Sequence, residues 1–206
     1  MQKSAVIAVL VLDRVEDAVP VAEALLAGGV DAMELTLRTP AALGALKAIK
    51  NHVEKMTAGI GTILTPDQVG QVADLGAAFG VSPGMNPRVV EKAFLRGLPF
   101  APGICTPSDI ERALEYDRKL LKFFPAEPSG GLKYLDSIAA PYAHLGLKYV
   151  PLGGLNEQNF GAYLRNPHVG GIGGSWLAPK NLIAEKNWAA ITENARRAIA
   201  VRDGIA

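Results

Sequence analysis

The stretch from Ala5 to Leu35, AVIAVLVLDRVEDAVPVAEALLAGGVDAMEL, decides the fold class of this chain. It begins with an apolar run of eight residues, Ala5–Leu12, and ends with a second short run, Asp31–Leu35. Between them, Asp17–Leu26 places its apolar residues at helical spacing, and Gly28 follows as a helix-closing residue. Strand, helix and strand in this order predict a βαβ unit, whose two strands run parallel.

Apolar runs of this kind recur along the whole chain, and several are bounded by Gly or Pro, as β-strands are. The eight runs are Ala5–Leu12, Asp31–Leu35, Thr57–Ile63, Ala78–Pro83, Pro99–Ile104, Leu120–Pro125, Lys148–Leu152 and Val169–Trp176. A threonine–proline pair, which is typical of a helix N-terminus, stands in three of the gaps, after residues 38, 64 and 105. The predicted helices that follow these pairs are Ala41–Val53, Asp67–Leu75 and Ser108–Leu120.

The repeated alternation of strand and helix predicts an α/β fold with a parallel sheet, because only a crossover returns the chain in the same direction. Eight such units predict a closed (β/α)8 TIM barrel, and 206 residues lie at the short end of the size range of that fold. We expect a single domain over residues 1–206, since no linker or low-complexity segment interrupts the series. A doubly wound open sheet is the alternative.

The composition narrows the possible functions. Hydrophobic residues are 49% and charged residues 20% of the chain, which excludes an intrinsically disordered protein. A net charge of +1 without a basic stripe predicts no nucleic-acid partner. One cysteine excludes a disulfide framework, and the longest apolar run is far shorter than the roughly 20 residues of a membrane-spanning helix. No signal peptide is recognisable, so we expect a cytoplasmic protein without a membrane partner.

Polar residues inside the predicted strands carry the chemistry, because both faces of a barrel strand are buried. In the second run, Glu34, Thr36 and Arg38 share the parity of the lumen and approach the C-terminal end, where barrel active sites lie. In the sixth run, Lys122 has lumen parity among apolar neighbours. Desolvation favours the neutral amine over the ammonium ion, and a nearby guanidinium such as that of Arg38 acts in the same direction.

A neutral lysine amine in an apolar barrel can attack a carbonyl carbon and form a Schiff base. The alternative for Lys122 is a structural ion pair with Glu34 inside the lumen, a pairing that barrel interiors also contain. The two interpretations are compatible, because a carboxylate beside an imine carbon can also transfer protons.

Glycines mark the ends of three further runs. The third run ends Gly59-Ile60-Gly61-Thr62, and its alternation gives Thr62 the lumen parity of Ala58 and Ile60, although a threonine there is usually only a hydrogen-bonding cap. The last two runs end in Gly153-Gly154 and Gly173-Gly174-Ser175. Barrels often bind phosphate at these two places through backbone N–H groups and a helix N-terminus. Tight turns without a ligand are the alternative.

The remaining candidates form no constellation. His52, His144 and His168 are isolated and lack the paired spacing of a metal site, so we expect no metal and no other cofactor. Cys105 follows a strand end without a catalytic partner, which is typical of a packed thiol. Glu127, in the segment FPAE at 124–127, is expected to be a loop carboxylate and not a second base.

These motifs, in this order, resemble the 2-keto-3-deoxy-6-phosphogluconate aldolase family, which also includes 4-hydroxy-2-oxoglutarate aldolases. The motifs are ELTLRT at 34–39, GIGT at 59–62, VSPG at 81–84, PG at 102–103, KFFPAE at 122–127 and GIGGSW at 171–176. The resemblance extends from about Ala5 to Ala178, and the lysine segment is its most specific part. It implies a class I aldolase on a (β/α)8 barrel that works as a homotrimer without a metal.

The resemblance also implies roles for single residues. Lys122 matches the Schiff-base lysine of the family, and Glu34 matches its general acid/base. Arg38 and Thr62 match the positions that hold the pyruvate carboxylate. The other matches line the pyruvate pocket or the phosphate site, and they are Pro83 and Phe124 for the pocket and Gly153, Gly154, Gly174 and Ser175 for the phosphate. Pro83 is supplied by the resemblance alone.

One position departs from the family pattern. The phosphogluconate members typically read Pro-Thr-Gly-Gly at the seventh strand, where this chain has Leu152 in place of the threonine. The galactonate relatives have an aliphatic residue there, whereas the stretches around Arg38 and Lys122 look more like the phosphogluconate branch. Leu152 has lumen parity and is expected to contact the substrate, but it cannot donate a hydrogen bond. The preference between the C4 epimers therefore stays open.

The predicted reaction is the cleavage of 2-dehydro-3-deoxy-6-phosphogluconate, a phosphorylated 2-keto-3-deoxy sugar acid, to pyruvate and glyceraldehyde 3-phosphate. Cleavage of 4-hydroxy-2-oxoglutarate to pyruvate and glyoxylate is a second candidate reaction. Two other classes of protein stay open. A sugar-phosphate isomerase would use Glu34 as a base without an imine, and a barrel that only binds a phosphorylated ligand would need no chemistry at Lys122.

Overall fold

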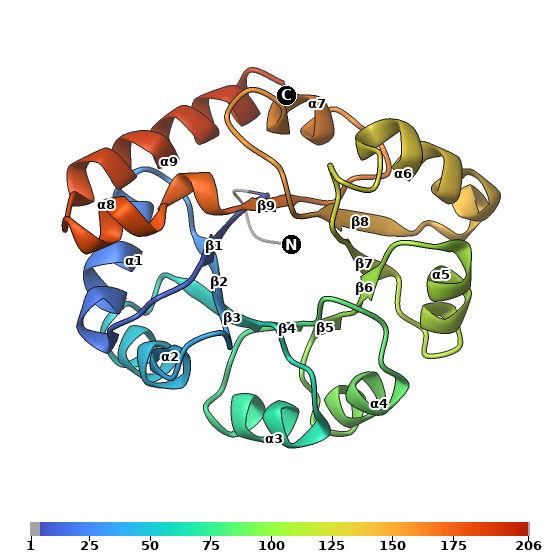
Figure 1. The fold of residues 1–206 in the computed structure, drawn as a ribbon, viewed down its shortest axis with the longest axis horizontal. Coiled ribbons are helices and arrows are strands. Elements are labelled where there is room, and N and C mark those ends of the chain that lie inside the picture. Colours follow the sequence, from blue (N-terminus) through green and yellow to red (C-terminus); the bar gives the residue numbers. More distant parts are fainter. Residues whose placement is uncertain (1–4, 206) are drawn as a thin grey trace.

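The computed structural model describes residues 5–205, and its elements alternate between strand and helix as expected (Figure 1). The strands are β1 (Val6–Leu10), β2 (Ala32–Thr36), β3 (Thr57–Gly61), β4 (Gly80–Val81), β5 (Phe100–Ala101), β6 (Gly103–Ile104), β7 (Leu120–Phe123), β8 (Lys148–Pro151) and β9 (Ile172–Gly174). The helices are α1 (Ala18–Ala27), α2 (Ala41–His52), α3 (Pro66–Asp74), α4 (Pro87–Leu95), α5 (Pro107–Leu114), α6 (Gly131–Ala139), α7 (Phe160–Leu164), α8 (Lys180–Ala184) and α9 (Trp188–Asp203). Short 3-10 helices cover Val15–Asp17, Ala140–Leu145 and Ser175–Leu177.

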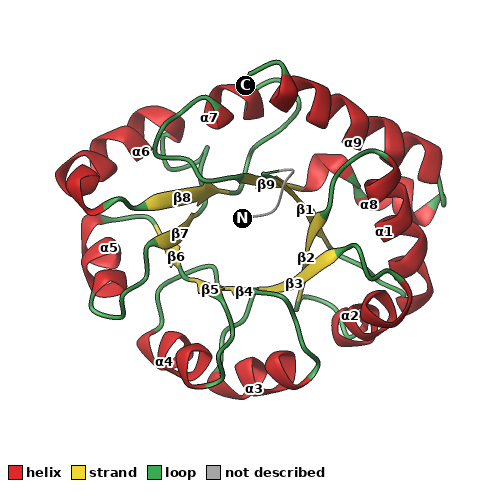
Figure 2. Ribbon diagram, turned by 180° about the vertical axis from the view of Figure 1, so that it is seen from behind, coloured by secondary structure: helices red, strands yellow, loops and turns green. Residues whose placement is uncertain are grey.

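The strands pair in parallel and form two sheets, with the orders β5-β4-β3-β2-β1-β9 and β6-β7-β8. Both views show the strands following a ring, with the helices on its outer side (Figures 1 and 2). This arrangement is an α/β fold with a curved parallel sheet, and it excludes an open sheet covered by helices on both faces. Over residues 5–205, each helix is too short or too polar to cross a bilayer.

The expected eight-stranded sheet is divided in two, and the sequence explains one of the two junctions. The fifth apolar run is split into β5 and β6 on either side of Pro102, because proline has no N–H with which to continue the ladder. The Pro102 carbonyl still accepts from the Lys122 N–H at 2.9 Å. At the other junction, Tyr149 of β8 forms an isolated parallel bridge with Val169, shortly before β9. The two sheets are therefore neighbours at both ends.

The helix start signals are confirmed at two of the three threonine–proline pairs. Thr65 and Thr106 form capping boxes with the side chains at the third helical position, Gln68 and Asp109. The prediction at Thr39 is wrong, because its hydroxyl instead donates to the carbonyl of Leu12, and α2 begins without a side-chain cap. The Thr39 hydroxyl thus bonds a backbone carbonyl that is distant in the sequence, and its side chain does not cap the helix that follows it. Helix α5 also ends six residues earlier than expected.

The alternation in β3 is opposite to the expectation. The register pairs Glu34 with Gly59, so the two glycines of β3 face the lumen and Ile60 lies on the helix-facing side, fully buried. The Glu34 side chain lies directly over Gly61, where an added β-carbon would stand 1.8 Å from its Oε1 atom. Thr62 nevertheless lines a cavity in the lumen, because its backbone turns into the left-handed region at a φ of 61° as the strand ends.

The cap of α5 gives a stability prediction. Thr106→Ala removes the oxygen that accepts from the Asp109 amide at 3.3 Å, so we expect the free energy of unfolding to fall by about 1 kcal/mol in urea titrations. Ser108→Ala is the matched control, because Ser108 is an exposed residue of the same helical turn but is not the cap. Equal losses in the two variants would contradict the capping role of Thr106.

Candidate active site

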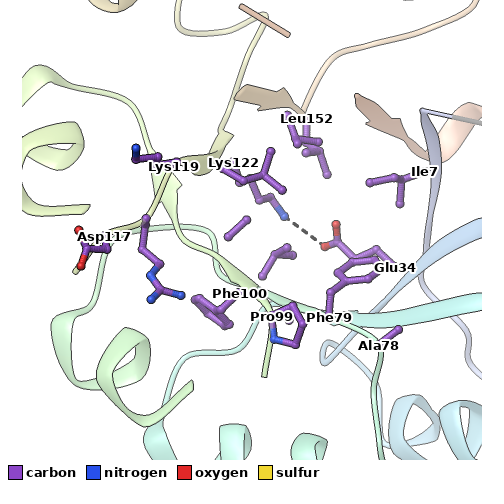
Figure 3. A pocket seen from close by; sticks show the side chains of 16 residues that line it. Ile7, Glu34, Ala78, Phe79, Pro99, Phe100, Asp117, Lys119, Lys122 and Leu152 are labelled. Atoms are coloured by element: carbon purple, nitrogen blue, oxygen red, sulfur yellow. Dashed lines mark hydrogen bonds and ion pairs between the residues drawn. The ribbon is translucent and has the colours of Figure 1, made fainter. Parts of the chain in front are cut away.

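The lumen-facing side chains of β2 and β7 meet inside the ring of strands. Lys122 Nζ donates to Glu34 Oε1 at 3.1 Å, and the two residues are 88 positions apart in the sequence. Their side chains are 7% and 2% exposed, so the ion pair is largely withdrawn from solvent. Figure 3 shows the two side chains pointing toward each other. The parity prediction for these two residues is therefore confirmed.

The strand ladder fixes the position of the Lys122 amine. Lys122 pairs in register with Gly103 of β6 on one side and with Val150 of β8 on the other. Its Nζ also lies 5.3 Å from the centre of the Phe124 ring, a geometry in which the ring face attracts a cation. The amine is thus held between a carboxylate and an aromatic ring, two partners that offset part of the cost of burying a charge.

Two cavities meet at this ion pair. The C-terminal cavity lies beyond the C-terminal ends of the strands and measures about 360 Å³. The N-terminal cavity, where the strands begin, measures about 390 Å³ and is walled by apolar side chains that include Phe79 and Phe100 (Figure 3). Glu34, Lys122 and Leu152 line both cavities, so the ion pair stands at the boundary between them.

The C-terminal cavity brings together every candidate that the sequence singled out as a site residue. These residues are Glu34, Arg38, Thr62, Pro83, Lys122, Phe124, Leu152, Gly153, Gly154, Gly174 and Ser175. They come from the ends of β2, β3, β7, β8 and β9 and from the loop after β4. Parallel strands bring their carboxyl ends to one edge, which explains how residues so far apart in sequence converge.

A guanidinium and a hydroxyl stand at one side of this cavity. Arg38 Nε donates to Thr36 Oγ1 at 3.3 Å, and Thr36 Oγ1 in turn donates to the Leu10 carbonyl at 3.0 Å. Within residues 5–205, the terminal nitrogens of Arg38 donate to no other residue. They remain available for a planar carboxylate, which accepts two parallel hydrogen bonds from such a group. Thr62 adds a hydroxyl at the end of the neighbouring strand.

Backbone amides stand at the other side. Gly153 and Gly154 have φ values of 93° and 87°, and their N–H groups donate to no other residue of the described part. The Gly154 carbonyl accepts from Asn159 Nδ2 at 3.2 Å. Successive free N–H groups in such a turn form a concave site that suits an anion. Gly174 and Ser175 face the same cavity, but the expected helix N-terminus there is only the 3-10 helix Ser175–Leu177.

Two further residues line the C-terminal cavity and were not singled out from the sequence. They are Val9 and Leu155. The alternation of β1 could have placed Val9 in the lumen, because Val9 pairs in register with Glu34. Gly173, which belongs to the glycine stretch expected at the end of the last run, also lines the cavity, and a β-carbon there would approach Leu152 to 3.0 Å.

The other candidates lie outside both cavities. Cys105 Sγ donates to Ser129 Oγ at 3.1 Å and is a partly buried thiol, in agreement with the sequence expectation. His52, His144 and His168 line neither cavity. Glu127 also lines neither, and it accepts a hydrogen bond from the Tyr163 hydroxyl.

Comparisons with known proteins agree with this geometry. Residues 1–194 match the model of the KDPG and KHG aldolase family. The chain is 43% identical over 192 residues to the 2-dehydro-3-deoxy-phosphogluconate aldolase of Treponema pallidum, covering 93% of this chain and 90% of that protein. It is 40% identical over 194 residues to the KHG/KDPG aldolase of Escherichia coli K12, covering 94% and 90%.

A solved structure is also similar. The KDPG aldolase of Legionella pneumophila, with pyruvate captured at low pH as a covalent carbinolamine intermediate, has a TM-score of 0.90 and 38% identity. The match covers 94% of this chain and 93% of that one. Because the family model and these relatives span nearly the whole sequence, the chain belongs to the KDPG and KHG aldolase family.

Proposed function

We propose that this chain is a class I aldolase that cleaves 2-dehydro-3-deoxy-6-phosphogluconate to pyruvate and glyceraldehyde 3-phosphate. The observation that carries the proposal is the buried pair of Lys122 and Glu34 at the floor of the C-terminal cavity. Carboxylate-binding groups lie at one side of this floor and free backbone amides at another. Family membership supports the same activity.

The reaction begins at Lys122. Transfer of its proton to Glu34, 3.1 Å away, leaves a neutral amine that attacks the C2 ketone of the substrate. Glu34, directly or through water, then protonates the hydroxyl of the carbinolamine, which leaves as water. The product is a protonated imine between Lys122 and C2. Arg38 and Thr62 hold the adjacent C1 carboxylate, because a guanidinium fork matches its two oxygens.

Cleavage follows from the electron-withdrawing imine. The Glu34 carboxylate accepts the proton of the C4 hydroxyl, the C3–C4 bond breaks, and its electron pair moves into the imine to form an enamine. The C4 fragment leaves as glyceraldehyde 3-phosphate. Protonation at C3 and hydrolysis of the imine release pyruvate and restore the amine. A positioned acid/base group of this kind contributes about 10²–10⁴-fold to the rate, and the lysine takes the place of a metal or other cofactor.

The proposal also covers the choice of substrate, for two reasons. The pyruvate half of 4-hydroxy-2-oxoglutarate offers Lys122 the same ketone, so we include its cleavage to pyruvate and glyoxylate. Leu152 directly precedes the glycine loop in the chain, lines the cavity together with Lys122 and presents only methyl groups to it. A hydrophobic contact distinguishes related substrates by about 1–3 kcal/mol at most, so we include the galactonate epimer as a weaker substrate.

The proposal extends to the architecture around the site. We take the two sheets as parts of one (β/α)8 barrel that forms a single domain over residues 1–206, since they adjoin at Pro102 and at the bridge between Tyr149 and Val169. The resemblance to the aldolase family supports a homotrimer. We also propose that the enzyme is cytoplasmic and that its substrates are small molecules. We expect no nucleic-acid or membrane partner.

Trapping of the imine tests the central step. Wild-type enzyme treated with pyruvate and borohydride should gain a reduced pyruvate adduct on Lys122, mapped by peptide mass spectrometry. Lys122→Met should form no adduct and lose aldol cleavage, whereas Lys119→Met, at the rim of the N-terminal cavity, should keep both. A wild-type enzyme that shows no adduct, or one at another lysine, would favour an isomerase or a binding protein over an aldolase.

A charged substitution tests the proposed phosphate site. Ser175→Asp places a carboxylate beside the proposed dianion, so we expect the KM for the phosphorylated substrate to rise about tenfold or more by like-charge repulsion. Pyruvate imine formation should change little, because pyruvate carries no phosphate. Equal damage to both reactions would place the phosphate elsewhere in the cavity.

Leu152 gives a prediction about specificity. Wild-type enzyme should cleave the gluconate and galactonate epimers with a modest preference for the gluconate form. Leu152→Thr adds a hydroxyl that can bond a substrate hydroxyl, and it should increase the ratio of the two kcat/KM values. An unchanged ratio in this variant would mean that residue 152 does not contact the substrate.

A further inference from the structure

The loop after β7 supports the glycine loop after β8. The Ala126 N–H donates to the Leu152 carbonyl at 2.8 Å, and the Glu127 N–H donates to the Gly153 carbonyl at 3.0 Å. These two bonds continue the pairing of β7 and β8 beyond the ends of the strands. The position of the free amides in the glycine loop therefore depends on the position of the segment that contains Glu127.

The Glu127 side chain lies across the back of Gly154. A β-carbon added at Gly154 would stand 2.5 Å from Glu127 Cβ and 2.9 Å from Cγ, closer than real carbon atoms approach. Gly154 lines the C-terminal cavity, whereas Glu127 does not. The glycine backbone is thus the partition between the cavity and the stem of this side chain.

Tyr163 holds the far end of the same side chain. Its hydroxyl, on helix α7, donates to Glu127 Oε1, and the residue is 1% exposed. Gly131 forms the opposite wall, where a β-carbon would stand 3.2 Å from Oε1 and 3.3 Å from the Tyr163 hydroxyl. Burial and the bond to Glu127 both raise the pKa of Tyr163, so it remains a donor at neutral pH.

This contact also has an electrostatic consequence. The stem of the Glu127 carboxylate packs against Gly154, one of the two residues whose amides we assign to a phosphate dianion. Like charges at such a separation repel each other, and the repulsion weakens as the distance grows. The Tyr163 hydroxyl engages this carboxylate, and Glu127 is not among the residues that line the C-terminal cavity.

We propose that Tyr163 is a positioning residue for the phosphate of the substrate. It holds Glu127 against the outer side of Gly154, which fixes the two-glycine loop and keeps the carboxylate away from the dianion. Tyr163 acts through Glu127 and touches no substrate atom. This inference rests on the proposed aldolase function and concerns the phosphorylated half of the substrate.

Tyr163→Phe is the test, because it removes the hydroxyl and keeps the ring. The KM for 2-dehydro-3-deoxy-6-phosphogluconate should rise about 3- to 10-fold, the range expected for one lost hydrogen bond, with little change in kcat. The kcat/KM for 4-hydroxy-2-oxoglutarate should stay at the wild-type value, because this substrate has no phosphate. Steady-state kinetics on both substrates measure the split.

The chain offers a matched control and a charge test. Tyr149→Phe makes the same change at another buried tyrosine, whose hydroxyl has no hydrogen-bond partner within residues 5–205, and it should leave both substrates unaffected. In Tyr163→Phe the Glu127 carboxylate is no longer held by the hydroxyl. Combining this change with Glu127→Gln removes the charge of that side chain, so the double variant should have a lower KM for the phosphorylated substrate than Tyr163→Phe alone.

The outcomes separate this inference from the proposed function. An unchanged KM in Tyr163→Phe, or an equal loss with both substrates, would overturn the positioning role. A double variant no better than Tyr163→Phe would overturn its electrostatic part. A wild-type enzyme that cleaves neither substrate would overturn the aldolase function itself, and the inference with it.

Discussion

The burial of Lys122 and Glu34 as a pair is the constraint on which the rest of the site depends. Withdrawing two charges from water costs several kcal/mol for each ion unless close partners offset it. Here the partners are each other, at 3.1 Å, and the face of the Phe124 ring. The neighbouring strand makes room for the carboxylate, because Gly61 has no side chain where Glu34 lies. Such an arrangement is costly for stability alone, which is why it points to chemistry.

Because the parallel strands all end at one edge, groups of two different kinds lie around the cavity above the Lys122–Glu34 pair. Each strand finishes at the same edge, so Arg38, shortly after β2, and the glycine loop after β8 face one cavity although over 100 residues separate them in the sequence. Lys122 lies deeper, within the strand ladder, where its backbone is fixed on both sides. In the proposed reaction, a substrate that spans the cavity has its ends held by groups at the rim and its reacting carbon at the floor.

The sequence predicted the strands and the chemistry of β2 and β7 because side chains of opposite character alternate there. Prediction failed where that information is missing. In β3 two glycines leave the lumen face unmarked, and the left-handed turn at Thr62 cannot be inferred from neighbouring residues. Thr39 failed as a cap because the competing acceptor, the Leu12 carbonyl, is distant in sequence. The division into two sheets at Pro102 was foreseeable, since proline cannot continue a ladder.

The two halves of the site are therefore encoded in different ways. Imine chemistry needs particular functional groups, an amine and a carboxylate, and their identities and parity are written in the sequence. Phosphate recognition uses backbone amides, which every residue except proline possesses, so the information lies in their orientation. At Gly154 that orientation depends on the Glu127 stem packed behind it and on the bond from Tyr163, contacts between three separate segments. Substitutions that alter phosphate binding without touching the chemistry should consequently occur in such supporting contacts as well as at the cavity wall.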